Sequence, residues 1–322
     1  AEKKYGVTIK AKILKGIFDF LSSFSFNNSS GESVDSLDPE ILGYIFEMSM
    51  MATDRKGTGA FYTPRQITSY ISDDAIYSVF LENVKKYLKT EHGYTDKNLE
   101  ELSHVEDIYE KLNELTLRSI FNDVLLKMRI CDNACGSGAF LLAAADTLFN
   151  VYFNIASKSG MNISEIGLKK LILNNNIYGV DLNANATEIA KLRMWLWIVD
   201  SYRVNVTEAL PNVDYNVRSG DSLLGYITFK EMETMTITID DYTAEQKSVK
   251  EILKDRTDLV AKYKSSSGQK AKEYAVKIDN LSIKLDGRLS NSYYQNHYGK
   301  NFDKNYLNHI SLKSYLNHFS FV

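Results

Sequence analysis

The sequence predicts an α/β fold in which a doubly wound parallel sheet is combined with a helical N-terminal region and a helical insertion. Short apolar segments at 128–132, 177–181 and 215–218 alternate with long helical patterns, and each is followed within a few residues by an aspartate or glycine. This strand-helix-strand-helix-strand order favours parallel strands joined by helical crossovers. Ligands of such sheets bind beyond the carboxyl ends of the strands.

Length and composition bound the class of protein. The 322 residues suggest two domains at about 150 residues each, and 44% hydrophobic residues suffice for a core. Lys and Arg number 38 against 41 Asp and Glu, a net charge of -3, so binding of nucleic acid by bulk positive charge is disfavoured. Any DNA contact would be a local patch or would lie on sequence outside this chain.

Two further classes are excluded by residue content. Cys131 and Cys135 cannot form a disulfide scaffold or complete a zinc site, which favours a reducing cytoplasm and predicts no metal. We find no apolar run near the 20 or so residues that a membrane span needs, so no membrane partner is expected. The oligomeric state is not predicted by any feature of the sequence.

The N-terminal part is predicted to be helical. Apolar residues recur at helical spacing over 5–26, and Asp38 with Pro39 has the form of a helix start. Thr63-Pro64-Arg65-Gln66 has the form of a capping box for a helix reaching about residue 88. That box is either a well-made helix start or an anion site at a helix N-terminus. A charged helical connector follows over 99–126.

The remaining helices are expected at 139–155, 163–173 and 184–199, and as a hairpin over 245–285 that breaks at 265–268. The helix at 163–173 accounts for the long interval between Asp132 and Asp181. The Lys-rich hairpin either contacts DNA phosphates or is a solvated helical pair. Residues 319–321 alternate like the start of a strand. The corresponding division is a helical region at 1–55, a ligand-binding domain at 56–230, a helical insertion at 231–310 and a strand start at 311–322.

A glycine loop follows the first predicted strand, in the run from Asp132 to Phe140. Gly136 and Gly138 remove side chains where a ligand could approach the backbone, and the helix that begins nearby directs free N–H groups toward the same place. Leu141 stands where a dinucleotide fingerprint needs its third glycine, and no Gly-Lys-Ser/Thr sequence follows, so NAD, FAD and nucleoside triphosphate hydrolysis are disfavoured. The alternative is a tight turn that binds nothing.

Acidic residues follow the next two predicted strands as well. Asp181 ends the second strand, and Asp221 comes just after the third. A carboxylate there accepts hydrogen bonds from ribose hydroxyls or an adenine amino group. Either acid alone could be a turn or N-cap residue, but three successive strands that each end in an acid favour one nucleoside site.

These motifs, in this order, resemble the N6-adenine DNA methyltransferases of restriction-modification systems. The residues that carry the resemblance are Gly59 to Pro64, Asp132 to Phe140, Gly179-Val180-Asp181, Ala190 to Leu196, and Gly220 to Leu223, with Leu42 to Glu47 as a helical lead-in. The similarity is to members of the type IIG kind, in which cofactor motifs precede the catalytic motif. It implies a Rossmann-like methyltransferase sheet, present in part, over roughly residues 37–229.

The resemblance implies that S-adenosylmethionine lies along the strand ends. Tyr62, Thr63 and Pro64 would hold its methionine end, and the loop residues Asp132, Ala134, Gly136 and Gly138 would line the same region. Asp181 would accept from the ribose hydroxyls and Asp221 from the adenine amino group, while Leu182 and Leu223 would flank the ring. Double-stranded DNA would be bound through regions mostly outside this chain.

The family's catalytic motif, Asn-Pro-Pro-Tyr or Asn-Pro-Pro-Phe, is absent from these residues, because Pro39, Pro64 and Pro211 are the only prolines and none adjoins another. We therefore assign no catalytic residue and expect a chain truncated before that motif, which binds S-adenosylmethionine without methylating DNA. Two alternatives stay open: a methyltransferase acting on protein or RNA, and a non-catalytic scaffold that keeps the fold.

Overall fold

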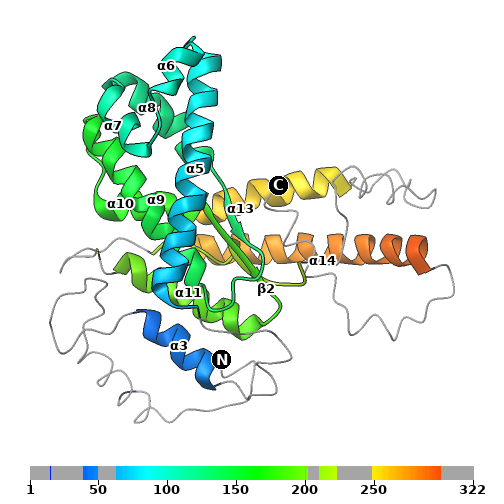
Figure 1. The fold of residues 1–322 in the computed structure, drawn as a ribbon. Helices are drawn as coiled ribbons and strands as arrows, with labels where there is room; N and C mark the ends of the chain where they lie inside the picture. Colours follow the sequence, from blue (N-terminus) through cyan, green and yellow to red (C-terminus); the bar gives the residue numbers. More distant parts are fainter. Residues whose placement is uncertain are drawn as a thin grey trace.

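The computed structural model describes residues 15, 39–49, 63–199, 201, 210–222 and 249–298 (Figure 1). The helix expected at 5–26 lies outside the described residues apart from residue 15, and the strand start at 319–321 lies outside them entirely. The same holds for Tyr62 and Leu223. What is described is a helix-rich structure around one small parallel sheet.

Three strands form that sheet: β1 (Ile130–Asp132), β2 (Ile177–Asp181) and β3 (Val217–Ser219). Their order is β1-β2-β3 and both pairs are parallel, with Asp132 opposite Gly179 and Asp181 opposite Ser219. The three predicted segments are thus strands of one sheet, although β1 and β3 begin two residues later than expected. Among the described strands the order runs in one direction, so the reversal that defines a doubly wound sheet stays a prediction.

The helices between the strands are those that the apolar spacing predicts. They are α9 (Ala139–Lys158), α10 (Glu165–Asn175) and α11 (Ala184–Val199). Helix α10 begins where the Ser164 side chain accepts a hydrogen bond from the Gly167 N–H, 3.1 Å away. Because α9 and α10 both lie between β1 and β2, the additional helix accounts for the long interval from Asp132 to Asp181.

Helix α9 is the centre of the core. It packs against α5 (Arg65–Glu91) on one side and against α10, α11 and the sheet on others. Its length and composition would suffice to cross a membrane, so the expectation that no apolar run is long enough is wrong for this helix. The physical reason for its apolar character is burial: residues such as Leu148, Val151 and Ile155 are fully enclosed by neighbouring elements.

The charged connector is helical but broken into short pieces. These are α6 (Asp96–Glu100), α7 (Val105–Lys111), α8 (Glu114–Asp123) and the 3₁₀ turn η1 (Leu125–Lys127). Side-chain caps cause the breaks: the Asn113 side chain accepts from the Thr116 N–H at 2.9 Å where α8 begins. In Figure 1 these helices lie beside the upper part of α5.

Helices cover both faces of the sheet. In β2, a Cβ added to Gly179 would lie 2.7 Å from Leu141 of α9, so this residue faces α9. Its neighbour Tyr178 faces the other way, because successive residues of a strand alternate. The opposite face of the sheet, toward which Tyr178 points, is covered by the hairpin of α13 (Val249–Lys264) and α14 (Gly268–Tyr298). Lys264 Nζ of this hairpin lies 5.2 Å from the Tyr178 ring centroid.

Two buried asparagines fix where β2 and β3 begin. Asn176 donates to the carbonyls of Leu125 and Met128, each at 2.8 Å, and accepts from the Tyr152 hydroxyl at 2.8 Å. Asn216 likewise donates to the Leu173 and Ile177 carbonyls, at 2.7 and 2.9 Å. Because both side chains are fully buried, these bonds satisfy backbone groups that water cannot reach.

Candidate functional site

The loops that follow the three strands are tied together at the carboxyl edge of the sheet. The Cys135 N–H, in the loop after β1, donates to the Val180 carbonyl at 2.9 Å, and the Gly220 N–H, after β3, donates to the Asp181 carbonyl at 2.8 Å. The Ser222 hydroxyl also donates to the Asn133 carbonyl. Asp132, Asp181 and the Gly220–Asp221 turn therefore meet at one edge, as the sequence predicts.

Asp181 holds the glycine loop directly. Its Oδ2 accepts the Gly136 N–H at 2.8 Å, and its Oδ1 accepts the Asn183 N–H at 2.8 Å. A carboxylate oxygen has two lone pairs, so each oxygen retains capacity for one more donor. Asp181 can thus fix the loop and still accept hydrogen bonds from a ligand.

Asp132 adds a second carboxylate to the same edge. Its Oδ1 accepts the Ala134 N–H at 3.0 Å, which shapes the start of the glycine loop. Burial raises the pKa of Asp132 above its usual value, and the nearby charge of Asp181 raises it further. A cationic ligand at this edge would offset both effects.

The two glycines of the loop have different reasons to be glycine. Both have positive φ, +53° at Gly136 and +88° at Gly138. A Cβ added to Gly136 would meet no atom within 4 Å, as expected where a ligand approaches, whereas one added to Gly138 would lie 2.9 Å from the Ala190 Cβ. Close approach of α11 therefore explains why residue 138 is a glycine, and the ligand contact expected of Gly138 stays a prediction.

Gly179 of β2 and Cys135 of the loop were not assigned a role at the site from the sequence. A Cβ on Gly179 would lie 3.0 Å from the Cys135 Sγ as well as touching Leu141, so Gly179 lets the loop settle on the strand. Burial raises the pKa of the Cys135 thiol far above its usual value, which keeps it protonated. A glycine inside an otherwise apolar strand was the available signal, since it indicates a close approach.

Leu182 follows Asp181, and its side chain is 71% exposed. Asp221 is half-buried beyond β3.

Helix α3 (Pro39–Ser49) begins at the predicted proline and supports the loop from behind. It packs on α11, where the buried Arg193 donates through Nη1 to the Ser137 carbonyl at 2.9 Å. A Cβ on Gly43 would lie 2.5 Å from the same Nη1, so the glycine allows α3 to approach closely. The helical lead-in of the sequence is therefore part of the loop's support.

Comparison with known proteins relates this arrangement to one family. Residues 105–218 match the family model described as MmeI, DNA-methyltransferase domain. A Methanocaldococcus jannaschii protein named as a type II restriction enzyme and methyltransferase is 36% identical over 231 residues, 67% of this chain and 19% of that protein. The type II restriction enzyme and methyltransferase RM.Eco57I of Escherichia coli is 28% identical over 172 residues, 46% of this chain and 17% of its own length.

The chain belongs to the methyltransferases of restriction-modification systems. DNA methyltransferase A of Bacillus subtilis is also similar, 24% identical over 160 residues, half of this chain and 16% of that protein. The chain spans about a fifth or less of the length of these relatives (19%, 17% and 16%). The family match runs from α7 to β3, so this methyltransferase domain contains the glycine loop and Asp181.

Thr63 and Pro64 precede α5, outside the residues that match the family model. The predicted capping box is wrong: Pro64 is the N-cap, the helix begins at Arg65, and no side chain caps it. The physical reason is that Pro64 has an extended ψ of 144°, so the helix starts one residue later than a Thr63 cap requires. Thr63 is half-buried and Pro64 is exposed. Within the part of the chain that the structure describes, neither residue forms a hydrogen bond to the loops after the strands.

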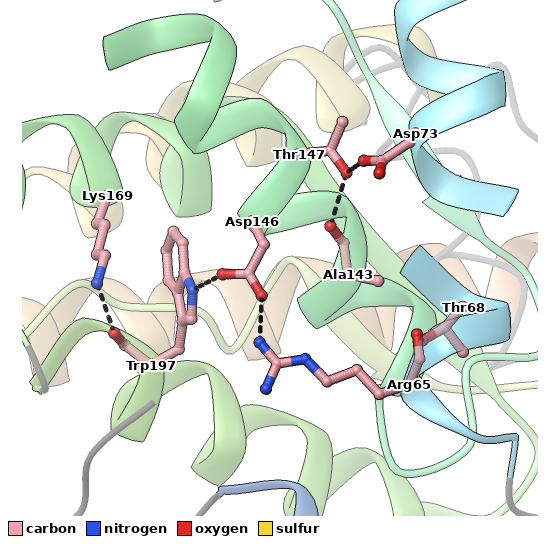
Figure 2. A network of polar contacts seen from close by, with 8 residues as sticks. All are labelled: Arg65, Thr68, Asp73, Ala143, Asp146, Thr147, Lys169 and Trp197. Atoms are coloured by element: carbon pink, nitrogen blue, oxygen red, sulfur yellow. Dashed lines mark hydrogen bonds and ion pairs between the residues drawn. The ribbon is translucent and has the colours of Figure 1, made fainter. Parts of the chain in front are cut away.

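The start of α5 is held on α9 by a residue that the sequence did not single out. Asp146 of α9 lies between Arg65 of α5 and Trp197 of α11 (Figure 2). Its Oδ2 is 3.4 Å from Arg65 Nη2, and its Oδ1 accepts a hydrogen bond from the Trp197 indole Nε1 at 2.6 Å. Asp73 and Thr147 form a second link between α5 and α9. Asp146 could have been noticed, because it is the one acidic residue in the apolar run 139–157.

Proposed function

We propose that the edge formed by the loops after β1, β2 and β3 binds S-adenosylmethionine, and that the whole enzyme transfers its methyl group to N6 of adenine in double-stranded DNA. One observation carries the proposal: three adjacent parallel strands each lead to a carboxylate, and the Gly136 N–H donates to the middle one, Asp181, at 2.8 Å. Ligands of open parallel sheets bind at this edge.

The residues present suit this cofactor. Each oxygen of Asp181 can accept one more donor, such as a ribose hydroxyl, and Asp221 would accept from the adenine amino group. The exposed side chain of Leu182 offers an apolar surface to the ring, with Leu223 expected on the other side. The open space beside Gly136 admits a ligand close to the backbone. When bound, S-adenosylmethionine would supply an electrophilic methyl group on a sulfonium.

Charge supports the same proposal. Asp132, Asp181 and Asp221 make the edge acidic, and the pKa of Asp132 is raised by burial and by Asp181. A sulfonium and an ammonium group would relieve this repulsion, whereas a nucleotide's phosphates would increase it. Ala134 and Gly138 line the loop, while Tyr62, Thr63 and Pro64 would complete the methionine end.

The acceptor is inferred from the family. The relatives are named as DNA methyltransferases or as restriction enzymes with a methyltransferase. The assignment of adenine N6 as the methyl acceptor depends on the order of the motifs in the sequence. Transfer is tested in the whole enzyme with labelled S-adenosylmethionine and duplex DNA, by identifying the modified base after digestion. Recovery of methylcytosine would refute the N6 assignment, and methylation of RNA or protein in place of DNA would refute the acceptor.

Cofactor binding is tested with a matched pair of leucines. Leu182 is 71% exposed at the proposed site and Leu115, on α8, is 75% exposed far from it in the sequence and fold, so neither Leu-to-Ala change removes a packed side chain. In calorimetric titration, Leu182→Ala should weaken S-adenosylmethionine binding about tenfold through lost apolar contact. Leu115→Ala should bind like wild type. Equal affinities in both variants would refute the contact between Leu182 and the cofactor, and no heat with wild type would favour a scaffold that has lost the ligand.

A further inference from the structure

The middle of β3 carries a second feature, on the face of the sheet opposite the core. Val217 packs into the main core, so the next residue along the strand, Arg218, faces the α13–α14 hairpin. The Arg218 guanidinium lies over the Tyr215 ring, with Cζ 4.2 Å from the centroid. Tyr215 in turn packs edge-on against Tyr263 of α13, with centroids 4.9 Å apart. Aromatic side chains therefore hold Arg218 in one orientation.

A second arginine lies in the same junction. Arg256 of α13 is 1% exposed, and its Nε donates to the Ser282 hydroxyl of α14 at 3.0 Å. Its Nη2 is buried and has no hydrogen-bond partner, and the same is true of Arg218 Nε. Unpaired buried guanidinium nitrogens are uncommon, because desolvating a charge without a partner is costly.

The acidic groups Asp214 and Asp279 attract this pair from nearby without contacting it directly. Among the described residues neither arginine makes an ion pair; Asp214 is bonded to the Tyr263 hydroxyl and lies 3.7 Å from Lys191 Nζ. Asp279 is exposed on α14. Burial and, second, the charge of Arg218 together lower the pKa of Arg256 to about 10. The Tyr215–Tyr263 contact joins Arg218 to α13, the helix that carries Arg256.

We propose that Arg218 and Arg256 form a binding site for an oxyanion of the phosphate class, at the junction of β3 with the α13–α14 hairpin and separate from the proposed cofactor site. Two guanidiniums offer several donors in fixed planes, which suits tetrahedral oxyanions. Arg256 forms the buried base of the site, and the half-exposed Arg218 forms its entrance. The phosphate is either a free ion or part of a DNA backbone, and the experiment distinguishes these sources.

The test measures the thermal midpoint of the full 322-residue chain in chloride and in inorganic phosphate at equal ionic strength. Phosphate at about 100 times its Kd should raise the wild-type midpoint by about 5 °C. Arg256→Met should remove this response and, in chloride, should unfold at a higher temperature than wild type because an unpaired buried charge is gone. Arg118→Met is the control for loss of an arginine elsewhere in the fold, since Arg118 Nε donates to the Ser159 carbonyl at 2.9 Å. It should keep the full phosphate response.

General stabilisation by phosphate would appear equally in all variants, so the proposal depends on the difference between Arg256→Met and Arg118→Met. An unchanged phosphate response in Arg256→Met overturns it. Should that variant not fold, Arg218→Gln changes only the half-exposed entrance and must still weaken the response. In the second arm, a DNA duplex at micromolar concentration should raise the midpoint in wild type and not in Arg218→Gln if the phosphate belongs to DNA. A response to inorganic phosphate without one to the duplex identifies a free ion, and no response to either overturns the proposal.

Discussion

Alanine at Gly138 should destabilise the protein much more than alanine at Gly136, although the two glycines lie in one loop and both have positive φ. Left-handed backbone costs an alanine about 1 kcal/mol at either position. At Gly138 the new Cβ would also lie 2.9 Å from the Ala190 Cβ. Overpacking of this kind adds about 1–3 kcal/mol, so we expect a total of about 3 kcal/mol for Gly138→Ala and about 1 kcal/mol for Gly136→Ala.

Gly93→Ala supplies the baseline. Gly93 has φ +66°, and a Cβ there would meet nothing within 4 Å, so the substitution reports backbone strain alone. Urea denaturation gives the three free energies of unfolding, and titration with S-adenosylmethionine gives the affinities. Gly136→Ala should match Gly93→Ala in stability but bind at least tenfold more weakly, because only its Cβ enters the proposed site.

A double variant tests the cause of the larger effect. Ala190→Gly alone should cost about 1 kcal/mol through helix propensity, yet in the Gly138→Ala background it should restore about 1–2 kcal/mol by removing the overlapping Cβ. If Gly138→Ala costs no more than Gly93→Ala, or if the two changes are simply additive, the packing explanation for Gly138 is refuted.

Three further predictions concern buried polar groups. Burial and the charge of Asp181 raise the pKa of Asp132, so the contribution of this carboxyl group to stability is full below its unfolded pKa and is lost as pH rises. Asp132→Asn should therefore unfold at a higher temperature than wild type at pH 7 but not at pH 3. The same variant should bind S-adenosylmethionine more weakly. Asn176→Ala removes three buried hydrogen bonds, to the Leu125 and Met128 carbonyls and from the Tyr152 hydroxyl, and should lower the free energy of unfolding by about 3 kcal/mol in urea. Burial, then Arg129, lowers the pKa of Lys264 to about 8, so wild type should gain stability relative to Lys264→Met as pH rises from 8 to 10.5, and parallel thermal midpoints over that range would contradict this.

The sequence predicts the strands and the long helices because their signals are local. Each strand is a short apolar run that ends at an acid or glycine, and α9 and α11 show continuous apolar patterns. The positions of Asp132, Asp181 and Asp221 follow from parallel pairing alone, since parallel strands end at the same edge.

What could not be predicted depends on contacts between distant segments. Gly138 and Gly43 are explained by neighbours 52 and 150 residues away, Ala190 and Arg193 respectively, and no local pattern encodes those pairs. The apolar character of α9 has the same origin, since a helix enclosed on several sides has the composition of a membrane span. The capping box was wrong because its spacing is necessary for a cap but does not determine the backbone angles at Pro64.

The bond from the Gly136 N–H to Asp181 has a kinetic consequence. Since this bond joins two groups of the protein itself, the entropy of ordering the loop is lost during folding and not on cofactor arrival. The site is preorganised, so we expect the observed association rate with S-adenosylmethionine to rise linearly with concentration, without the plateau that a slow rearrangement of the loop would impose.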